Sequence, residues 1–279
     1  MKRESKINLN LKFRKNFFYA PIKNLWFLSH HKILHEINID ISKGISSEIK
    51  KKALVITGIH RSNPLLLKFF SRVKIGIQTE QLYDHKENKL WGHDVCKKNI
   101  LKNLKYYDAI LDLSPFNKAF YLENNIPLKK ITFGPYIFPE KAPNYDPKPN
   151  GHLLFIGSLS CEKRVAKLNS LAKKQPKLKI MGEKSYGKKL QLEIIKSTAL
   201  ININMGNKKY APYPRILKSV LYGKPLISET LPPPFKKNIH FIEIEQINKE
   251  KSERSYLNIS NFLRHRFSFN KFLKKVLVS

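Results

Sequence analysis

The sequence is poor in cysteine, which excludes two common ways of stabilising a small domain. Its 279 residues include two cysteines, Cys96 and Cys161, and neither belongs to a C-x-x-C or Cys/His pattern. A disulfide framework needs more cysteines, and a structural zinc site needs closely spaced ligands. We therefore expect a globular protein in a reducing, cytoplasmic setting, with a core drawn from the 42% of residues that are hydrophobic.

Long apolar runs are also absent. The basic N-terminus, MKRESKINLNLKFRKNFF, lacks the continuous apolar stretch of a secretion signal. No other run approaches the roughly 20 apolar residues that a membrane-spanning helix needs. We expect a soluble protein, and a peripheral position at the inner face of the membrane stays open as an alternative.

Acidic residues are scarce. The chain has 21 Asp and Glu against 53 Lys and Arg, so its formal net charge is +32. This excess favours a polyanionic partner such as nucleic acid, an anionic membrane or a phosphorylated ligand. Only nine of the cations are arginines, although arginine is the usual reader of phosphates and bases. Since AT-rich codons also enrich lysine, the charge alone does not identify the partner.

Several functional motifs are missing. Neither G-x-G-x-x-G nor a Walker sequence follows any predicted strand. No D-x-D stands in the chain to hold a divalent ion, and helix-turn-helix, zinc-finger, RRM and KH signatures are absent. We therefore expect neither a metal ion nor a cofactor.

What the chain does contain is an alternation of short apolar runs and helical segments. Runs such as ALVITGI and VKIGIQ precede the segment KAPNYDPKPNG, and runs such as HLLFIGS and ALININM follow it. The alternation predicts parallel βαβ units, and the density of Pro, Asn and Gly predicts a linker. We predict an α/β protein with two Rossmann-like domains facing a cleft, over residues 1–145 and 150–255, followed by an amphipathic helix over 256–279.

Residues that directly follow predicted strands are the candidates for binding and catalysis. In α/β sheets, ligands bind beyond the carboxyl ends of the strands. In the first half, Glu80 or His60 would orient or deprotonate a hydroxyl. In the second half, the predicted ligand-binding positions are Gly157, Ser158, Asn204, Gly206 and Glu229.

Two segments of the second half carry a family resemblance. HLLFIGSLSCEKR and RILKSVLYGKPLISE are similar to the donor-binding domain of GT-B glycosyltransferases, especially the family 4 and family 1-like group. In that family a basic residue a few positions after the glycine lies near the diphosphate of the sugar nucleotide, and Lys163 and Arg164 match it. The resemblance also implies a last helix that crosses back to the N-terminal domain.

One departure from the family concerns a pair of glutamates eight residues apart. Here those positions are Tyr210 and Lys218, so the usual ribose-binding carboxylate is missing. Glu229 would replace it, because a carboxylate accepts hydrogen bonds from vicinal hydroxyls. Arg215 would face the donor phosphate. The plainer alternative is that Arg215 and Glu229 pair with each other as a structural clamp.

The resemblance implies a hexosyltransferase-like enzyme that moves a sugar from a nucleotide-sugar donor to an acceptor hydroxyl without a metal. The acceptor would be a glycan, a lipid-linked glycan or modified DNA. The alternatives are a nucleic-acid-binding protein, favoured by the charge, and a glycosyltransferase acting on modified DNA. Peripheral contact with an anionic membrane or nucleic acid stays open, since the C-terminal helix is basic and amphipathic.

Overall fold

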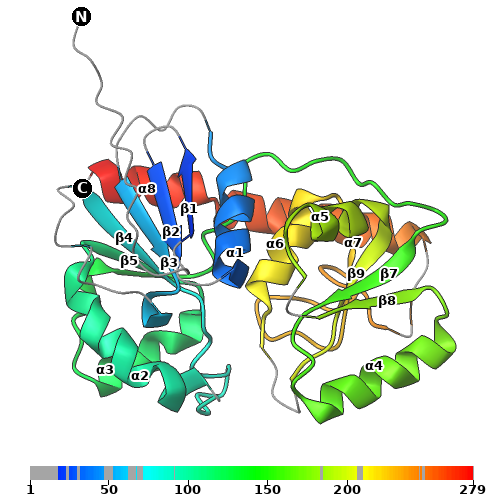
Figure 1. Cartoon of the computed structure of the whole chain (residues 1–279), viewed down its shortest axis with the longest axis horizontal. Coiled ribbons are helices and arrows are strands. Elements are labelled where there is room, and N and C mark those ends of the chain that lie inside the picture. The colour runs from blue at the N-terminus through cyan, green and yellow to red at the C-terminus, as the bar shows by residue number, and fades with distance from the viewer. Residues whose placement is uncertain are drawn as a thin grey trace, which may run out of the picture.

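A computed structural model describes residues 18–22, 25–29, 32–46, 53–61, 67, 72–90, 92–182, 185–205, 210–244, 246 and 249–278. These residues form a mixed α/β structure with two separate sheets, one on each side of Figure 1. No helix among them is long and apolar enough to cross a bilayer.

The first sheet has six strands in chain order, with the first pair antiparallel and the others parallel. They are β1 (Phe18–Ile22), β2 (Leu25–Ser29), β3 (Ala53–Thr57), β4 (Val73–Gln78), β5 (Ala109–Asp112) and β6 (Ile131–Phe133). This sequential order differs from the expected Rossmann-like order, in which the strand sequence reverses near the middle of the sheet. The chain instead enters at one edge through the antiparallel pair and adds each later strand on the same side.

Helices cover both faces of the first sheet. The helix α1 (Lys32–Lys43) joins one hydrophobic cluster with Phe27, Val55 and Ile75. The helices α2 (Gly92–Asn103) and α3 (Lys118–Glu123) share the other cluster with Leu54 and Ile110. The short 3-10 helix η1 (Ile59–Arg61) directly follows β3. The carboxyl edge of this sheet therefore lies between two packed layers.

The second sheet has four parallel strands in the order β10-β9-β7-β8. The strands are β7 (His152–Ile156), β8 (Leu178–Met181), β9 (Ser197–Asn202) and β10 (Leu226–Ser228), and the helices between them are α4 (Glu162–Lys174), α5 (Gly187–Lys196) and α6 (Tyr213–Leu221). The order reverses between β7 and β9, so this sheet has the switch point at which α/β proteins bind ligands.

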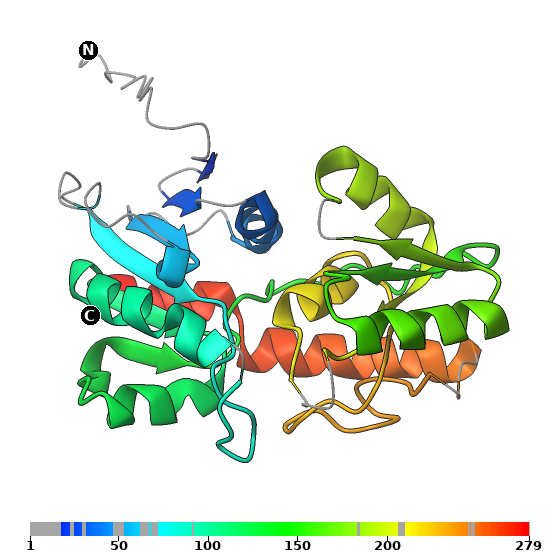
Figure 2. The ribbon, with the colours of Figure 1, turned by 60° about the horizontal axis from the view of Figure 1, so that its bottom comes forward.

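The C-terminal segment forms two helices where a single one was predicted. They are α7 (Lys249–Arg266) and α8 (Phe269–Val278). At the break Phe138 pairs with the chain: Phe138 N donates to Phe267 O at 3.2 Å, and Phe269 N donates to Phe138 O at 3.0 Å. Beyond the break, α8 returns to the first sheet, where the Phe27 and Phe269 ring centroids are 6.0 Å apart. Figure 2 shows the two helices running along both halves of the molecule.

The helices α1 and α6 join the two sheets. Ile216 and Leu217 of α6 belong to the same hydrophobic cluster as the α1 face of the first sheet. At the edge of this contact Lys218 forms a buried ion pair with Asp40, and Lys43 Nζ donates to Tyr222 Oη at 2.7 Å. Lys218 thus links α6 of the second half to α1 of the first. The domain boundaries at 145 and 150 stay predictions.

Candidate functional site

The guanidinium of Arg215 lies across the switch point of the second sheet. Arg215 comes from the first turn of α6. Its Nε donates to Ile156 O at 3.0 Å, at the end of β7, and its Nη1 donates to Asn202 Oδ1, at the end of β9. Burial lowers the pKa of Arg215 to about 10, with Arg164 acting in the same direction. The side chain therefore stays cationic at neutral pH, beside a second cation.

That second cation, Arg164, is 2% exposed. Its Nη1 donates to Ser158 O at 2.9 Å, and its Nη2 donates to Tyr210 Oη. Its Nε has no partner within the described part of the chain. The guanidinium carbons of Arg164 and Arg215 lie 5.6 and 5.0 Å from the centroid of the Phe155 ring. Two arginines therefore share one aromatic support.

Neither arginine has an anionic partner in the part of the chain that the structure describes. No carboxylate among the described residues lies within 4.0 Å of either guanidinium. All their hydrogen-bond acceptors are carbonyl, amide or hydroxyl oxygens. Enclosing a cation among neutral groups is costly unless an anion joins it.

Gly157 fits this arrangement because it has no side chain. A Cβ atom at this position would lie 2.6 Å from Nη2 of Arg215, closer than non-bonded atoms approach. Since hydrogen bonds hold Arg215 in place, a larger residue would displace the guanidinium. The structure thus brings Gly157, Arg164 and Arg215, all predicted from the sequence, to one place.

Glu229 pairs with groups other than Arg215. Its Oε1 contacts Lys167 Nζ at 2.5 Å, and its Oε2 accepts a hydrogen bond from Asn204 N at 2.7 Å. The side chain is 22% exposed. Asn204 and Glu229 therefore lie together, as their positions after neighbouring strands predict. The alternative of a clamp between Arg215 and Glu229 is wrong.

The remaining predicted donor positions differ in what surrounds them. The Ser158 Oγ lies 2.8 Å from Ser160 Oγ, and its carbonyl accepts from Arg164. Lys163 is exposed on the first turn of α4. Gly206 lies outside the described residues. No group of three or more His, Cys, Asp or Glu side chains suited to a metal ion occurs in the described ranges.

At the carboxyl edge of the first sheet, His60 is held as a neutral acceptor. It is 4% exposed, and burial, aided by Arg61, lowers its pKa to about 4. Its Nδ1 lies 3.3 Å from Gln78 Oε1, and its Nε2 accepts from Arg61 Nε at 3.2 Å. Because Gln78 Oε1 can only accept, the proton of the neutral ring is on Nδ1.

Glu80 lies next to this histidine. Its Oε1 is 3.7 Å from His60 Nε2, and its side chain is 37% exposed. Burial raises the pKa of Glu80, while Arg61 opposes the rise. A carboxylate that is partly exposed and more basic than usual is suited to accept a proton from a bound hydroxyl.

The edges of the two sheets are in contact. Gln81 Oε1 accepts a hydrogen bond from Ala211 N at 3.3 Å, so the residue after Glu80 touches the residue after Tyr210. Tyr213 of α6 shares a hydrophobic cluster with Leu111 and Leu113 at the end of β5, and burial together with the Asp112 carboxyl raises the pKa of Tyr213. The loop after β4 therefore contacts the segment that leads into α6.

Three positions in this region were missed by the sequence analysis. Tyr210 supports Arg164, as described above. Asn117 holds the loop that carries Glu80: its Oδ1 accepts from Leu82 N at 2.7 Å, and its Nδ2 donates to Glu80 O at 2.9 Å. Asp112 in turn accepts from Asn117, and burial raises its pKa to about 7 against these hydrogen bonds. The sequence does point to Asp112, because an acidic residue at the end of the apolar strand AILD is unusual.

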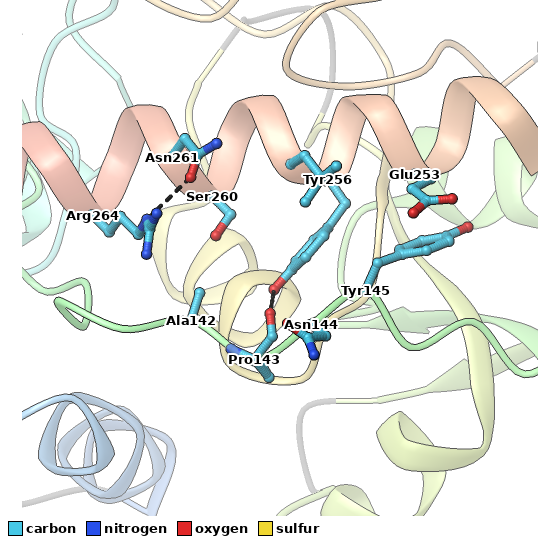
Figure 3. Close-up of a pocket in the computed structure, with 10 residues that line it drawn as sticks. Ala142, Pro143, Asn144, Tyr145, Glu253, Tyr256, Ser260, Asn261 and Arg264 are labelled. Carbon is cyan, nitrogen blue, oxygen red and sulfur yellow. Dashed lines mark hydrogen bonds between the residues drawn. The ribbon is translucent and has the colours of Figure 1, made fainter.

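The pocket drawn in Figure 3 lies elsewhere, between the 142–145 segment and α7. It has a volume of about 300 Å³ and shares no residue with the predicted site. In it, Tyr256 Oη donates to Pro143 O, and Arg264 Nε donates to Asn261 Oδ1 at 3.1 Å. Its described contacts attach the 142–145 segment to α7.

Replacing His60 with glutamine is expected to change how stability depends on pH. The folded-state pKa of about 4 lies below the ordinary value of 6.5, so the unfolded chain binds the extra proton between these values. The stabilisation is complete above about pH 6.5 and is lost as the pH falls to about 4. The free-energy advantage of the wild type over the variant should therefore shrink from pH 7 to pH 4 in urea denaturation.

The control for this measurement is His265→Gln, which removes an exposed histidine at the end of α7. It should give a stability curve parallel to that of the wild type. If the difference in unfolding free energy between the wild type and the His60 variant stays constant over this pH range, burial of a neutral His60 is contradicted.

Comparison with known proteins gives weak likenesses. No family model and no curated protein matches the chain. Among solved structures, it is similar to Anabaena HepE in complex with UDP-glucose, with 7% identity, a TM-score of 0.49 and coverage of 87% of this chain and 81% of that one. A second is the Glycosylation Associate Protein (Gap123) complex from Streptococcus agalactiae, with 13% identity and a TM-score of 0.42. The likeness covers 84% of this chain but 55% of that one. With TM-scores this low, neither likeness assigns a fold or a function.

Proposed function

We propose that the chain is a glycosyltransferase of the GT-B type, which transfers a hexose-like sugar from a nucleotide-sugar donor to an acceptor hydroxyl. The observation that carries the proposal is the pair of a buried Arg164 and a half-buried Arg215 at the switch point of the second sheet, with no anion beside them among the described residues. The diphosphate of the donor is the anion that would complete this pair.

A diphosphate suits these two arginines in charge and in geometry. Each guanidinium presents a planar fork of donors that matches phosphate oxygens, and such charge-assisted bonds are about twice as strong as neutral ones. The pair would also stabilise the charge that develops on the leaving diphosphate. In this proposal the two cations perform the task that a divalent metal performs in other enzymes.

Glu229 would bind the ribose of the donor. Each carboxylate oxygen can accept two hydrogen bonds, and the described contacts use one on each oxygen, from Lys167 and from Asn204 N. Two acceptor positions thus remain for vicinal hydroxyls. In the GT-B glycosyltransferases that the chain resembles, a glutamate binds the ribose. Lys218 stands at that position here, and it pairs with Asp40.

Glu80 would act as the base for the acceptor hydroxyl. Its pKa is raised by burial, which brings its basicity closer to that required at neutral pH. His60 is unsuited to this step because its Nε2 already accepts from Arg61. We therefore assign proton transfer to Glu80 and a positioning role to His60.

Replacing Arg164 with alanine is expected to weaken nucleoside diphosphate binding by about 1.5 to 3 kcal/mol, because it removes a charge-assisted hydrogen bond. Lys163→Ala should also weaken binding, by less, since the exposed amine is screened by solvent. Calorimetry with a panel of nucleoside diphosphates measures both effects. The control is Arg254→Ala, which removes an equal charge from the exposed surface of α7.

The same panel tests the proposal itself. Unchanged diphosphate affinity in Arg164→Ala would remove this residue from the donor site. If no nucleoside diphosphate binds the wild type while duplex DNA binds with a steep dependence on salt, the protein is a nucleic-acid binder and the proposal fails.

A further inference from the structure

Arg61 is an exposed arginine held at the carboxyl edge of the first sheet. The only hydrogen bond that its side chain makes within the described residues runs from Nε to His60 Nε2. This bond leaves the four N–H groups of its two Nη atoms for another partner. No described carboxylate lies within 4.0 Å of the guanidinium, although Glu80 is near enough for Arg61 to affect its pKa.

His60 fixes the orientation of Arg61. The ring is buried, its Nδ1 is directed to Gln78 Oε1, and its lone pair at Nε2 therefore faces the arginine. Gln78 is itself fully buried at the end of β4. A chain of three side chains thus links the Arg61 guanidinium to the buried end of β4, and this restraint lowers the entropy lost when a ligand binds.

We propose that Arg61 binds an oxyanion carried by the acceptor, beside the hydroxyl that Glu80 receives. The identification of the bound molecule as the acceptor rests on the proposed function, whereas the anion site itself does not. The chemistry that fits is a phosphate or a carboxylate, since both present two oxygens to the planar guanidinium fork. An acceptor of this class carries its own negative charge close to the reacting hydroxyl.

The contact between Gln81 and Ala211 joins the loop after β4 to the second half of the chain. It keeps the Arg61 edge of the first sheet next to the segment that leads from Tyr210 into α6. Donor and acceptor anions would therefore enter from opposite sheets, each with its own arginine. Because the donor and the acceptor would each bind a different arginine, their negative charges would be neutralised separately as the two molecules approach each other.

The test is a titration of ¹⁵N-labelled protein with inorganic phosphate and, separately, with sodium acetate. The reporters for the Arg61 site are the backbone amides of Arg61 and Glu80, and those for the donor site are Gly157 and Ser158. Phosphate should shift the first pair saturably in the wild type. In Arg61→Gln the midpoint at Glu80 should rise at least tenfold, and Arg61→Lys should fall in between because it keeps the charge without the fork.

Arg254→Gln, with the same loss of charge on α7, should retain the wild-type midpoint. Saturation by phosphate at lower concentration than acetate indicates a phosphorylated acceptor, and the reverse order indicates a carboxylated one. An unchanged midpoint at Glu80 in Arg61→Gln, or no saturable shift with either anion, overturns the inference. The proposed function fails separately, if no nucleoside diphosphate moves the Gly157 and Ser158 amides.

Discussion

Lys218→Met is expected to destabilise the protein by about 3 to 5 kcal/mol, the usual cost of removing one partner from a buried ion pair. The variant would leave the Asp40 carboxylate enclosed between α1 and α6. Lys43, whose Nζ lies 3.4 Å from Asp40 Oδ1, offsets part of this loss, so we expect the lower end of the range. The free energy of unfolding from urea denaturation measures the effect.

A double variant separates the charge from the packing. Asp40→Leu combined with Lys218→Met replaces both ions with apolar groups, and such replacements are often neutral or stabilising. The double variant should therefore be more stable than Lys218→Met alone. Its loss of unfolding free energy should be smaller than the sum of the losses in the two single variants. Additive losses would contradict the ion pair as a determinant of how the two halves associate.

Arg215→Met is expected to weaken nucleoside diphosphate binding by about 2 to 5 kcal/mol, as for truncation of one member of an enclosed charge pair. This corresponds to a loss of affinity between about 30-fold and a few thousand-fold. The bare nucleoside should lose little, because it has no phosphate to contact Arg215. Glu229→Gln should weaken the nucleoside and the diphosphate alike, since both contain the ribose.

Calorimetry on both variants with both ligands distinguishes these outcomes, and melting curves without ligand provide the control for folding. Arg215→Met should affect stability less than binding, because removing a cation that lacks an anion compensates for the lost hydrogen bonds to Ile156 O and Asn202. Equal losses for the nucleoside and the diphosphate in Arg215→Met would place the phosphate elsewhere.

Local patterns account for the parts of the fold that were predicted. Apolar runs of strand length between helical segments predicted parallel α/β units, and both sheets contain them. The antiparallel β1–β2 pair was missed because the first 50 residues have no clear periodicity. The break between α7 and α8 was missed because it depends on Phe138, which is distant in sequence.

In the candidate site, too, local patterns predict some features, and others depend on residues distant in sequence. Gly157 and Asn202 lie at the carboxyl ends of the neighbouring strands β7 and β9, which can be read from hydropathy, and Arg215 reaches both strand ends from the first turn of α6. Which polar groups pair was not predictable: Glu229 contacts Lys167 on α4, and Lys218 contacts Asp40 on the other half. Such pairings depend on helix orientation, which no local pattern specifies.

The return of α8 to the first sheet has a consequence for how the chain folds during synthesis. Domains usually fold from the N-terminus as they leave the ribosome. Here Phe269, Phe272 and Leu273 complete the core that begins with Phe27 and Ile37, so the first half lacks part of its core until α8 has been made. The part of this apolar face that α1 does not cover stays exposed until α8 is made, and a truncated chain ending before α8 would leave it open to chaperones or to aggregation.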